Sequence, residues 1–171
     1  MKLLFVLSVM TVSVYATSTA MAASQRAELR TKTDALISNT WYMQRVIGMK
    51  LTRTSRSYRY QKSVPYLHWV TRHWQKINQH VRQAFHNPPH FGALVCIHGY
   101  EGAWNSNTGN GYYGGLQQDL GFQRKYAPWL VQHKGTADNW TPLEQIWTAE
   151  KAVQTRGFWP WPNTARLCGL L

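Results

Sequence analysis

The sequence of 171 residues predicts an α+β fold that is predominantly α-helical: a helical hairpin followed by a small carboxyl-terminal domain. Apolar side chains recur every three, four or seven residues in two early segments, which is the spacing of one helix face. Asn87-Pro88-Pro89 then stops the second segment. The β component is predicted from the glycine-rich residues 108–117, because Asn110-Gly111 favours a hairpin turn.

Residues 1–22 have the features of a secretory signal peptide. Lys2 precedes an apolar run over residues 3–14, and Ala20-Met21-Ala22 is a small-x-small cleavage site. The run is short for a membrane span, although an uncleaved anchor is the alternative. We expect export, a mature chain that begins near Ala23, and no stable membrane insertion after cleavage.

Residues 23–90 are predicted to form a basic helical stalk. The first helix is indicated by apolar residues spaced by seven, seven and four: Leu29, Leu36, Met43 and Ile47. The second helix starts near Ser63 and Pro65 and has a seam with steps of three and four: Leu67, Val70, Trp74, Ile77, Val81 and Ala84. Residues 52–62, which connect the helices, have no apolar periodicity and are expected to form an exposed loop.

The stalk also holds nearly all of the formal net charge of +12. Residues 24–90 contain twelve Lys and Arg against Glu28 and Asp34, whereas residues 91–171 contain six against five acids. These cations could simply solvate the outer helix faces, or they could bind an anionic polymer. Nucleic acid is one such polymer, because three arginines alternate with Tyr58 and Tyr60, but export argues against it and we expect no nucleic-acid partner.

Cysteine and histidine usage limits the chemistry further. An exported chain reaches an oxidising compartment, so Cys96 and Cys168 are expected to form a disulfide, with two separate buried thiols as the alternative. The seven histidines do not converge: His86 and His90 have helical metal-ligand spacing, but the intervening prolines break that geometry. We expect no metal and no other cofactor.

Glu101 is the strongest candidate for chemistry in residues 91–171. An apolar helix is predicted to lead to it, and Trp104 could place an indole beside its carboxyl group. Cleaving a glycosidic bond needs a positioned acid, because the leaving oxygen must be protonated. The following glycine-rich run carries flat rings and amides that suit sugars, so it is expected to form the wall of a sugar-polymer cleft. The candidate binding residues are Trp104, Thr108, Asn110, Tyr112, Tyr113 and Gln117.

The other acids of this region have structural explanations. Asp119 is interpreted as a cap of the helix that contains Leu120 and Phe122. Asp138 is expected in a loop, and Glu144 stands three residues after Thr141, as a capping box requires. Glu101 is therefore the one convincing catalytic acid.

Four motifs follow one another in about the last eighty residues: Glu101-Gly-Ala-Trp-Asn, Thr108-Gly-Asn-Gly-Tyr-Tyr-Gly-Gly-Leu-Gln, Trp140-Thr-Pro-Leu-Glu-Gln, and Trp161-Pro-Asn before Cys168-Gly. In this succession the chain resembles the transglycosylase-like domain of the resuscitation-promoting factors, actinobacterial secreted proteins of the lysozyme-like superfamily that cleave peptidoglycan. Two spacings depart from the family: Cys96 lies five residues before Glu101 instead of adjacent to it, and residues 101–108 form a slightly shorter stretch.

The resemblance implies a lysozyme-like domain over residues 91–171, with Glu101 as general acid and base, residues 108–117 as cleft wall, and the Cys96–Cys168 bridge. It implies a secreted or wall-associated enzyme, a muralytic glycosidase or lytic transglycosylase, that acts on MurNAc-GlcNAc glycan strands of peptidoglycan. The basic stalk could hold it on anionic wall polymers. The alternatives are a non-catalytic glycan-binding or signalling module, and a cationic membrane-active protein that acts through residues 24–90.

Overall fold

The computed structural model describes the backbone of residues 3–171 and the side chains from Thr19 onward, so the side chains of most of the predicted signal peptide lie outside the described residues. The contacts divide the chain into two compact units. One comprises residues 1–40 and 52–80, and the other comprises residues 41–51 and 81–171. The second unit thus includes residues 41–51 and 81–90, which fall within the segment predicted as stalk. Among the described residues, no helix combines the length and the apolarity that a membrane crossing requires.

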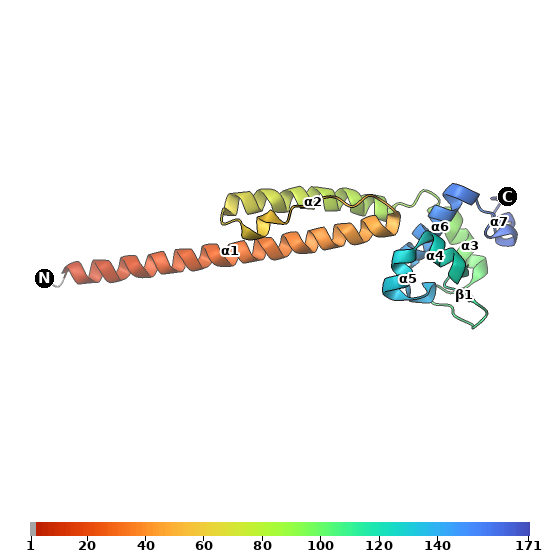
Figure 1. The fold of residues 1–171 in the computed structure, drawn as a ribbon, viewed down its shortest axis with the longest axis horizontal. Coiled ribbons are helices and arrows are strands. Elements are labelled where there is room, and N and C mark those ends of the chain that lie inside the picture. Colours follow the sequence, from red (N-terminus) through yellow and green to blue (C-terminus); the bar gives the residue numbers. More distant parts are fainter. Residues whose placement is uncertain (1–2) are drawn as a thin grey trace. The chain divides into compact units, whose positions relative to one another are not determined.

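The first unit is a helical hairpin. Helix α1 (Leu3–Ile47) and helix α2 (Val64–His86) lie side by side along it (Figure 1). The α1 seam contains Ile37 where the sequence predicted Leu36, because two threonines, at positions 33 and 40, share the buried face. The hydroxyl of Thr33 hydrogen-bonds that of Thr71 across the helices at 2.8 Å, so a polar pair fills a place that apolar spacing does not reveal.

The connection between the two helices is largely exposed, as expected, but it contains one ordered turn and one buried side chain. It contains a 3₁₀ turn, η1 (Ser57–Tyr60), and Tyr58 is only 3% exposed. The Tyr58 hydroxyl donates to the Asp34 carboxylate, which Arg59 also contacts at 2.7 Å. Because Tyr58 is buried, it is not available for the base stacking that the nucleic-acid alternative would require.

The second unit is predominantly α-helical, with one small sheet. Strand β1 (Tyr112–Tyr113) pairs antiparallel with β2 (Gln118–Asp119), with Tyr112 opposite Asp119. The further elements are α3 (Phe91–Glu101), α4 (Leu120–Tyr126), α5 (Pro128–Lys134), η2 (Ala137–Asn139), α6 (Pro142–Arg156) and α7 (Pro162–Leu167). Its core gathers apolar side chains from α3, the sheet turn, α6 and α7: Leu94, Ile97, Leu116, Ile146, Ala149, Val153, Trp161 and Ala165.

The helix caps that the sequence predicted are present. Asp119 accepts a hydrogen bond from the Phe122 amide at 2.8 Å and so caps α4. Thr141 and Glu144 form a reciprocal capping box at the start of α6, and α6 ends before Gly157, which has a φ of 57°.

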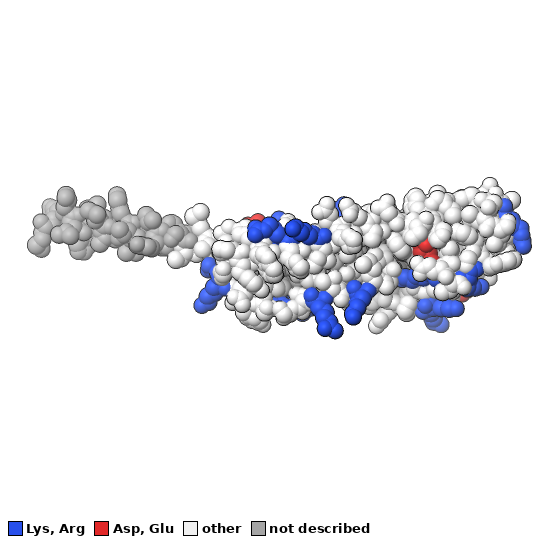
Figure 2. Space-filling model, turned by 90° about the horizontal axis from the view of Figure 1, so that it is seen from above, with Lys and Arg blue, Asp and Glu red and all other residues white. Residues whose placement is uncertain are grey.

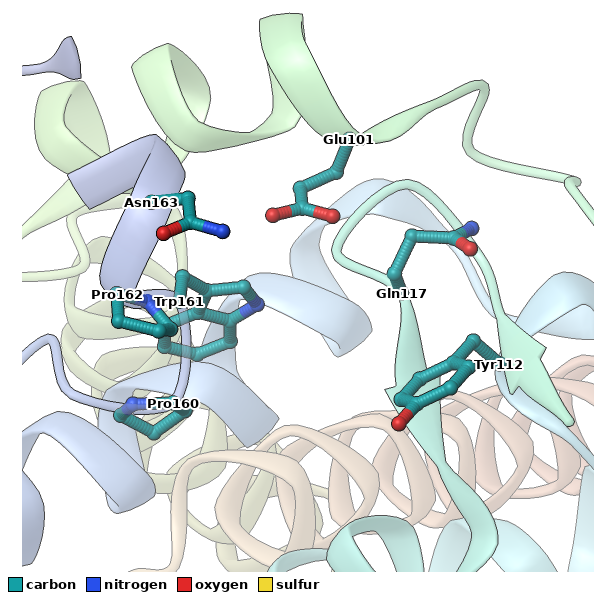
Figure 3. Close-up of a pocket in the computed structure, with 7 residues that line it drawn as sticks. All are labelled: Glu101, Tyr112, Gln117, Pro160, Trp161, Pro162 and Asn163. Carbon is teal, nitrogen blue, oxygen red and sulfur yellow. The ribbon is translucent and has the colours of Figure 1, made fainter. Parts of the chain in front are cut away.

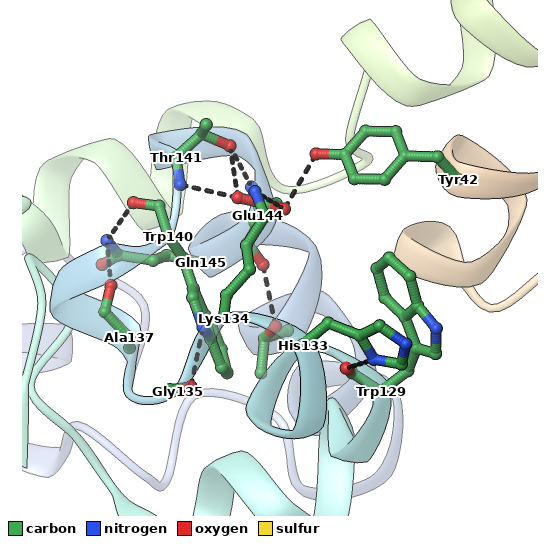
Figure 4. A network of polar contacts seen from close by, with 11 residues as sticks. Tyr42, Trp129, His133, Lys134, Gly135, Ala137, Trp140, Thr141, Glu144 and Gln145 are labelled. Atoms are coloured by element: carbon green, nitrogen blue, oxygen red, sulfur yellow. Dashed lines mark hydrogen bonds and ion pairs between the residues drawn. The ribbon is translucent and has the colours of Figure 1, made fainter. Parts of the chain in front are cut away.

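Glu144 does more than cap its helix (Figure 4). Its carboxylate is fully buried, and it accepts hydrogen bonds from Lys134 at 2.7 Å and from the Tyr42 hydroxyl at 2.8 Å. Burial alone would raise the pKa of Glu144, but the bonds from Lys134, Thr141 and Tyr42 outweigh burial and lower it. This one carboxylate therefore joins the segment around Tyr42, α5 and α6 within the second unit.

A disulfide joins Cys96 of α3 to Cys168, just after α7, with their Cα atoms 6.1 Å apart. The predicted pairing is thus present. The bond closes a loop with a sequence separation of 72 residues, for which chain entropy predicts a stabilisation of about 4 kcal/mol. It holds α7 against α3.

Lys151 provides a pH-dependent test of packing in the second unit. It lies beside Arg45, Trp129 and Leu130, and burial lowers the pKa of its ammonium group to about 8. Between this value and the ordinary value of 10.5, the unfolded chain binds more protons than the folded chain, so stability should rise with pH. We expect Lys151→Met to raise the free energy of unfolding near neutral pH by about 1–2 kcal/mol and to remove this rise.

Urea denaturation at neutral and alkaline pH measures both effects. Lys32→Met, at an exposed position of α1, is the control and should leave the alkaline rise in place. If the free energy of unfolding of Lys151→Met rose with pH as much as that of the parent, the lowered pKa of Lys151 would not be the cause of the rise.

Candidate active site

Glu101 is the last residue of α3, and its carboxylate faces a cavity of about 270 Å³ (Figure 3). The Thr164 hydroxyl donates to Glu101 Oε1 at 2.8 Å. In the described part of the chain, no hydrogen bond engages the other carboxylate oxygen, Oε2. Aromatic, amide and proline side chains line the cavity together with Glu101: Tyr112, Gln117, Pro160, Trp161, Pro162 and Asn163.

Glu101 is the only carboxylate among the described residues that line this cavity. A neighbouring hollow of about 160 Å³ shares Tyr112, Gln117 and Trp161 with it and contains Asp119. Asp119 Oδ1 is engaged in capping α4. The cavity therefore does not contain a facing pair of carboxylates, such as two-acid glycosidases use.

The turn between the two strands forms one wall, and its backbone is held from two sides at Gly115. The Gly115 amide donates to Gln145 Oε1 at 2.8 Å, and its carbonyl lies 3.1 Å from His98 Nδ1. Because a carbonyl only accepts, Nδ1 of His98 carries the proton in this contact. A side chain on Gly115 would collide with the His98 ring and with Trp104.

The Gln145 amide group also contacts two more backbone segments, and Figure 4 shows its contacts to Ala137 and Trp140. Its side chain is fully buried, and Nε2 lies within hydrogen-bonding distance of three carbonyl oxygens: Trp104 at 2.7 Å, Ala137 at 2.8 Å and Trp140 at 3.1 Å. Gly114 passes so close to Gln145 that a Cβ atom at this position would overlap the amide oxygen. Glycine is therefore required at both positions by close approach, and at Gly114 also by its positive φ of 73°.

Trp161 fixes the opposite wall. Its indole is buried, and Nε1 donates to the Leu116 carbonyl at 2.8 Å, so residues 160–163 are attached to the same turn. The Cys96–Cys168 disulfide and the Thr164–Glu101 bond hold the following helix, α7, against α3. The three segments around the cavity are thus mutually tied.

Comparison with known proteins identifies this region. A family model described as a transglycosylase-like domain matches residues 98–164, a span that begins just before Glu101 and ends at Thr164. Resuscitation-promoting factor RpfE of Mycobacterium tuberculosis is 40% identical over 65 residues, which cover 38% of this chain and 35% of that protein. This part of the chain is a transglycosylase-like domain and is similar to part of a resuscitation-promoting factor. Its predominantly α, lysozyme-like fold is the one the sequence predicted.

Two of the predicted binding residues of the transglycosylase-like domain, Tyr112 and Gln117, lie with Glu101 in the cavity. Thr108, Asn110 and Tyr113 do not line it. Asn110-Gly111 does lie in a turn, at the tip of a loop that the bridge between Asn107 and Tyr113 closes. A second turn, which the sequence did not predict, comprises residues 114–117 and joins the two strands.

Trp104 was expected to place an indole beside Glu101, but it packs elsewhere. Its ring stacks on His98 with a centroid distance of 3.8 Å and contributes to the core. The indole of the cavity belongs to Trp161. Spacing from Glu101 favoured Trp104, whereas the motif Trp161-Pro-Asn was the signal that could have located the second wall.

Two glycines of the turn region allow a matched test of the Gln145 contact. Gly111 and Gly114 both have positive φ, at 86° and 73°, but only at Gly114 would a Cβ meet another group. We expect Gly111→Ala to cost about 1 kcal/mol of stability from backbone strain and Gly114→Ala about 3 kcal/mol or more. Urea denaturation of the two variants measures the difference, and equal losses would contradict the close approach to Gln145.

Proposed function

We propose that this protein cleaves the glycan strand of peptidoglycan and that Glu101 is its general acid. The observation that carries the proposal is a lone carboxylate held at the rim of an open cavity of amide and aromatic side chains, in a transglycosylase-like domain. The similarity to a resuscitation-promoting factor supports a wall glycan as substrate, although the match covers about a third of that relative.

The geometry at Glu101 supports a direction for proton transfer. Because Oε1 accepts the Thr164 hydroxyl bond, Oε2 is the oxygen that would carry the acidic proton into the cavity. That proton passes to the bridging oxygen as the bond from this oxygen to C1 breaks, and the leaving sugar departs as a neutral hydroxyl. Tyr112 and Gln117 on one wall and Trp161 on the other would contact the sugars that flank the bond.

With no second carboxylate in the cavity, we propose that the substrate stabilises C1 itself. The oxygen of the N-acetyl group bonds to C1 as the leaving oxygen departs. Glu101, now ionised, then removes a proton from the attacking hydroxyl, whose oxygen bonds to C1 as the bond from the N-acetyl oxygen to C1 breaks. A hydroxyl of the same sugar yields an anhydro end, and water yields a reducing end.

The remaining parts of the chain complete the proposal. Residues 1–22 direct export and are removed, residues 23–90 form the basic stalk, and residues 91–171 form the catalytic domain. The protein then acts outside the cell or at the wall, where anionic polymers would attract the stalk. A non-catalytic glycan-binding or signalling module is the competing function, and it would use the same cavity without bond cleavage.

Glu101→Gln tests the mechanism, since Gln retains an oxygen for Thr164 but cannot donate a carboxyl proton. We expect the release of soluble fragments from purified peptidoglycan to fall by about 100-fold or more. The matched control is Asp119→Asn, because Asn caps helices as well as Asp and the carboxylate alone is lost. Its activity should remain within about threefold of the parent.

Two outcomes would contradict the proposal. Substantial fragment release by Glu101→Gln would exclude Glu101 as the acid. Binding without cleavage by both the parent protein and Glu101→Gln would favour the binding module. The masses of the released fragments report anhydro against reducing ends.

A further inference from the structure

The outer face of α2 carries exposed aromatic and basic side chains that the proposed reaction does not use. We define the aromatic–basic strip as Tyr66, Trp69, Arg72, His73 and Lys76, which share one helix face at spacings of three and four. Trp69 is 56% exposed and Tyr66 is 38% exposed. An indole this exposed presents a ring face on which a ligand can stack.

The three rings of the strip are close neighbours, with Tyr66 tilted by 30° to Trp69. The Trp69 and His73 rings are nearly parallel, with an interplanar angle of 9° and a centroid distance of 5.7 Å, and Tyr66 lies 5.8 Å from Trp69. A shallow hollow of about 150 Å³ is lined by Trp69, Arg72, His73 and Lys76. The hollow thus combines an aromatic surface with two cationic groups.

The charges of the strip are not neutralised within the hairpin. Helix α2 contains no Asp or Glu, and none of the ion pairs among the described residues involves Arg72 or Lys76. Asp34 of α1 is already engaged by Tyr58 and Arg59. Figure 2 shows the same imbalance more widely: Lys and Arg predominate over acidic residues on the face in view. The complementary ligand is therefore an anion.

The strip does not have the form of a membrane-inserting helix. Such a helix needs a continuous apolar face, but the apolar side chains of α2, including Leu67, Val70 and Trp74, are buried in the hairpin. What remains outside is a pair of aromatic rings bordered by cations. This pattern fits a ligand with flat apolar faces and regularly spaced charges.

We propose that the aromatic–basic strip is a second, non-catalytic binding site for an anionic polysaccharide. A sugar ring stacks on Trp69, and phosphate or carboxylate substituents of the chain pair with Arg72 and Lys76. The choice of a polysaccharide over other polyanions rests on the proposed function, because a chain with a glycan-cleaving site gains effective concentration from a second site on the same polymer network. This assigns the stalk's wall attachment to five residues of α2.

The test uses the chain from Ala23 with Glu101→Gln, so that the polymer is bound but not digested. The probes are wall sacculi that retain their phosphate-bearing glycopolymers and the same sacculi after acid stripping. We expect Trp69→Ser, and separately the pair Arg72→Gln and Lys76→Gln, to weaken co-sedimentation with the intact sacculi about tenfold. Binding to stripped sacculi should be weaker for the parent and unaffected by these variants.

The pair Lys32→Gln and Lys50→Gln removes the same charge from exposed positions outside the strip and should change binding by less than about twofold. With Glu101 intact, the strip variants should cleave short soluble glycan fragments at the parental rate. If the parent protein does not cleave these fragments, the proposed function is refuted. The co-sedimentation result would still test the strip, because binding is measured independently of cleavage.

Three results would overturn the strip proposal: unchanged binding by the strip variants, an equal loss in the lysine control, or an equal loss on stripped sacculi. Two further probes are tested in the same way: vesicles of phosphatidylglycerol and phosphatidylcholine, and single-stranded DNA. A strip-dependent loss confined to either of them would replace the polysaccharide with a membrane or a nucleic acid.

Discussion

The side-chain amide of Gln145 is the interaction on which the geometry of the site depends. Buried in α6, it accepts from the Gly115 amide and lies within hydrogen-bonding distance of the carbonyls of Trp104, Ala137 and Trp140. A buried amide that loses its partners costs about 1–3 kcal/mol, so these backbone segments cannot move away from α6 independently. Two further buried glutamines continue the arrangement: Gln118 donates to the Gln145 carbonyl, and Gln123 donates to that of Gln118.

This constraint explains how a small domain presents one acid in a defined setting. Glu101 comes from α3, the turn 114–117 is fixed to α6, and Trp161 attaches the third segment to the turn through the Leu116 carbonyl. The disulfide and the Thr164 hydroxyl then hold α7 at Glu101. An acid acts best when it is positioned before reaction, and the surroundings of Glu101, our proposed acid, are set by buried backbone contacts instead of by flexible surface side chains.

Local patterns predicted much of this structure. The caps at Asp119 and Thr141, the end of α6 and the start of α2 depend on neighbouring residues, which the sequence shows directly. Other features depend on distant partners. Tyr58 is buried because Asp34 accepts its hydroxyl, and Trp104 leaves the cavity because His98 stacks on it. Neither partner is visible from spacing along the chain.

In the glycine-rich residues 108–117, the sequence predicted some features of the structure and missed others. Its composition predicted tight turns beside Glu101, and Tyr112 and Gln117 do line the cavity. The strand-joining turn nevertheless lies at residues 114–117, because Gly114 and Gly115 are the positions where Gln145, His98 and Trp104 come closest to the backbone. Composition predicts where a chain can turn, whereas the side chains packed against it determine where it does.

Amide hydrogen exchange at Gly115 tests the central claim most directly. Because this amide donates to the buried Gln145 Oε1, it should exchange at least about 100-fold more slowly than the amides of the exposed loop tip at Gly109 and Gly111. Exchange of Gly115 at the rate of the loop tip would show that Gln145 does not hold the cavity wall.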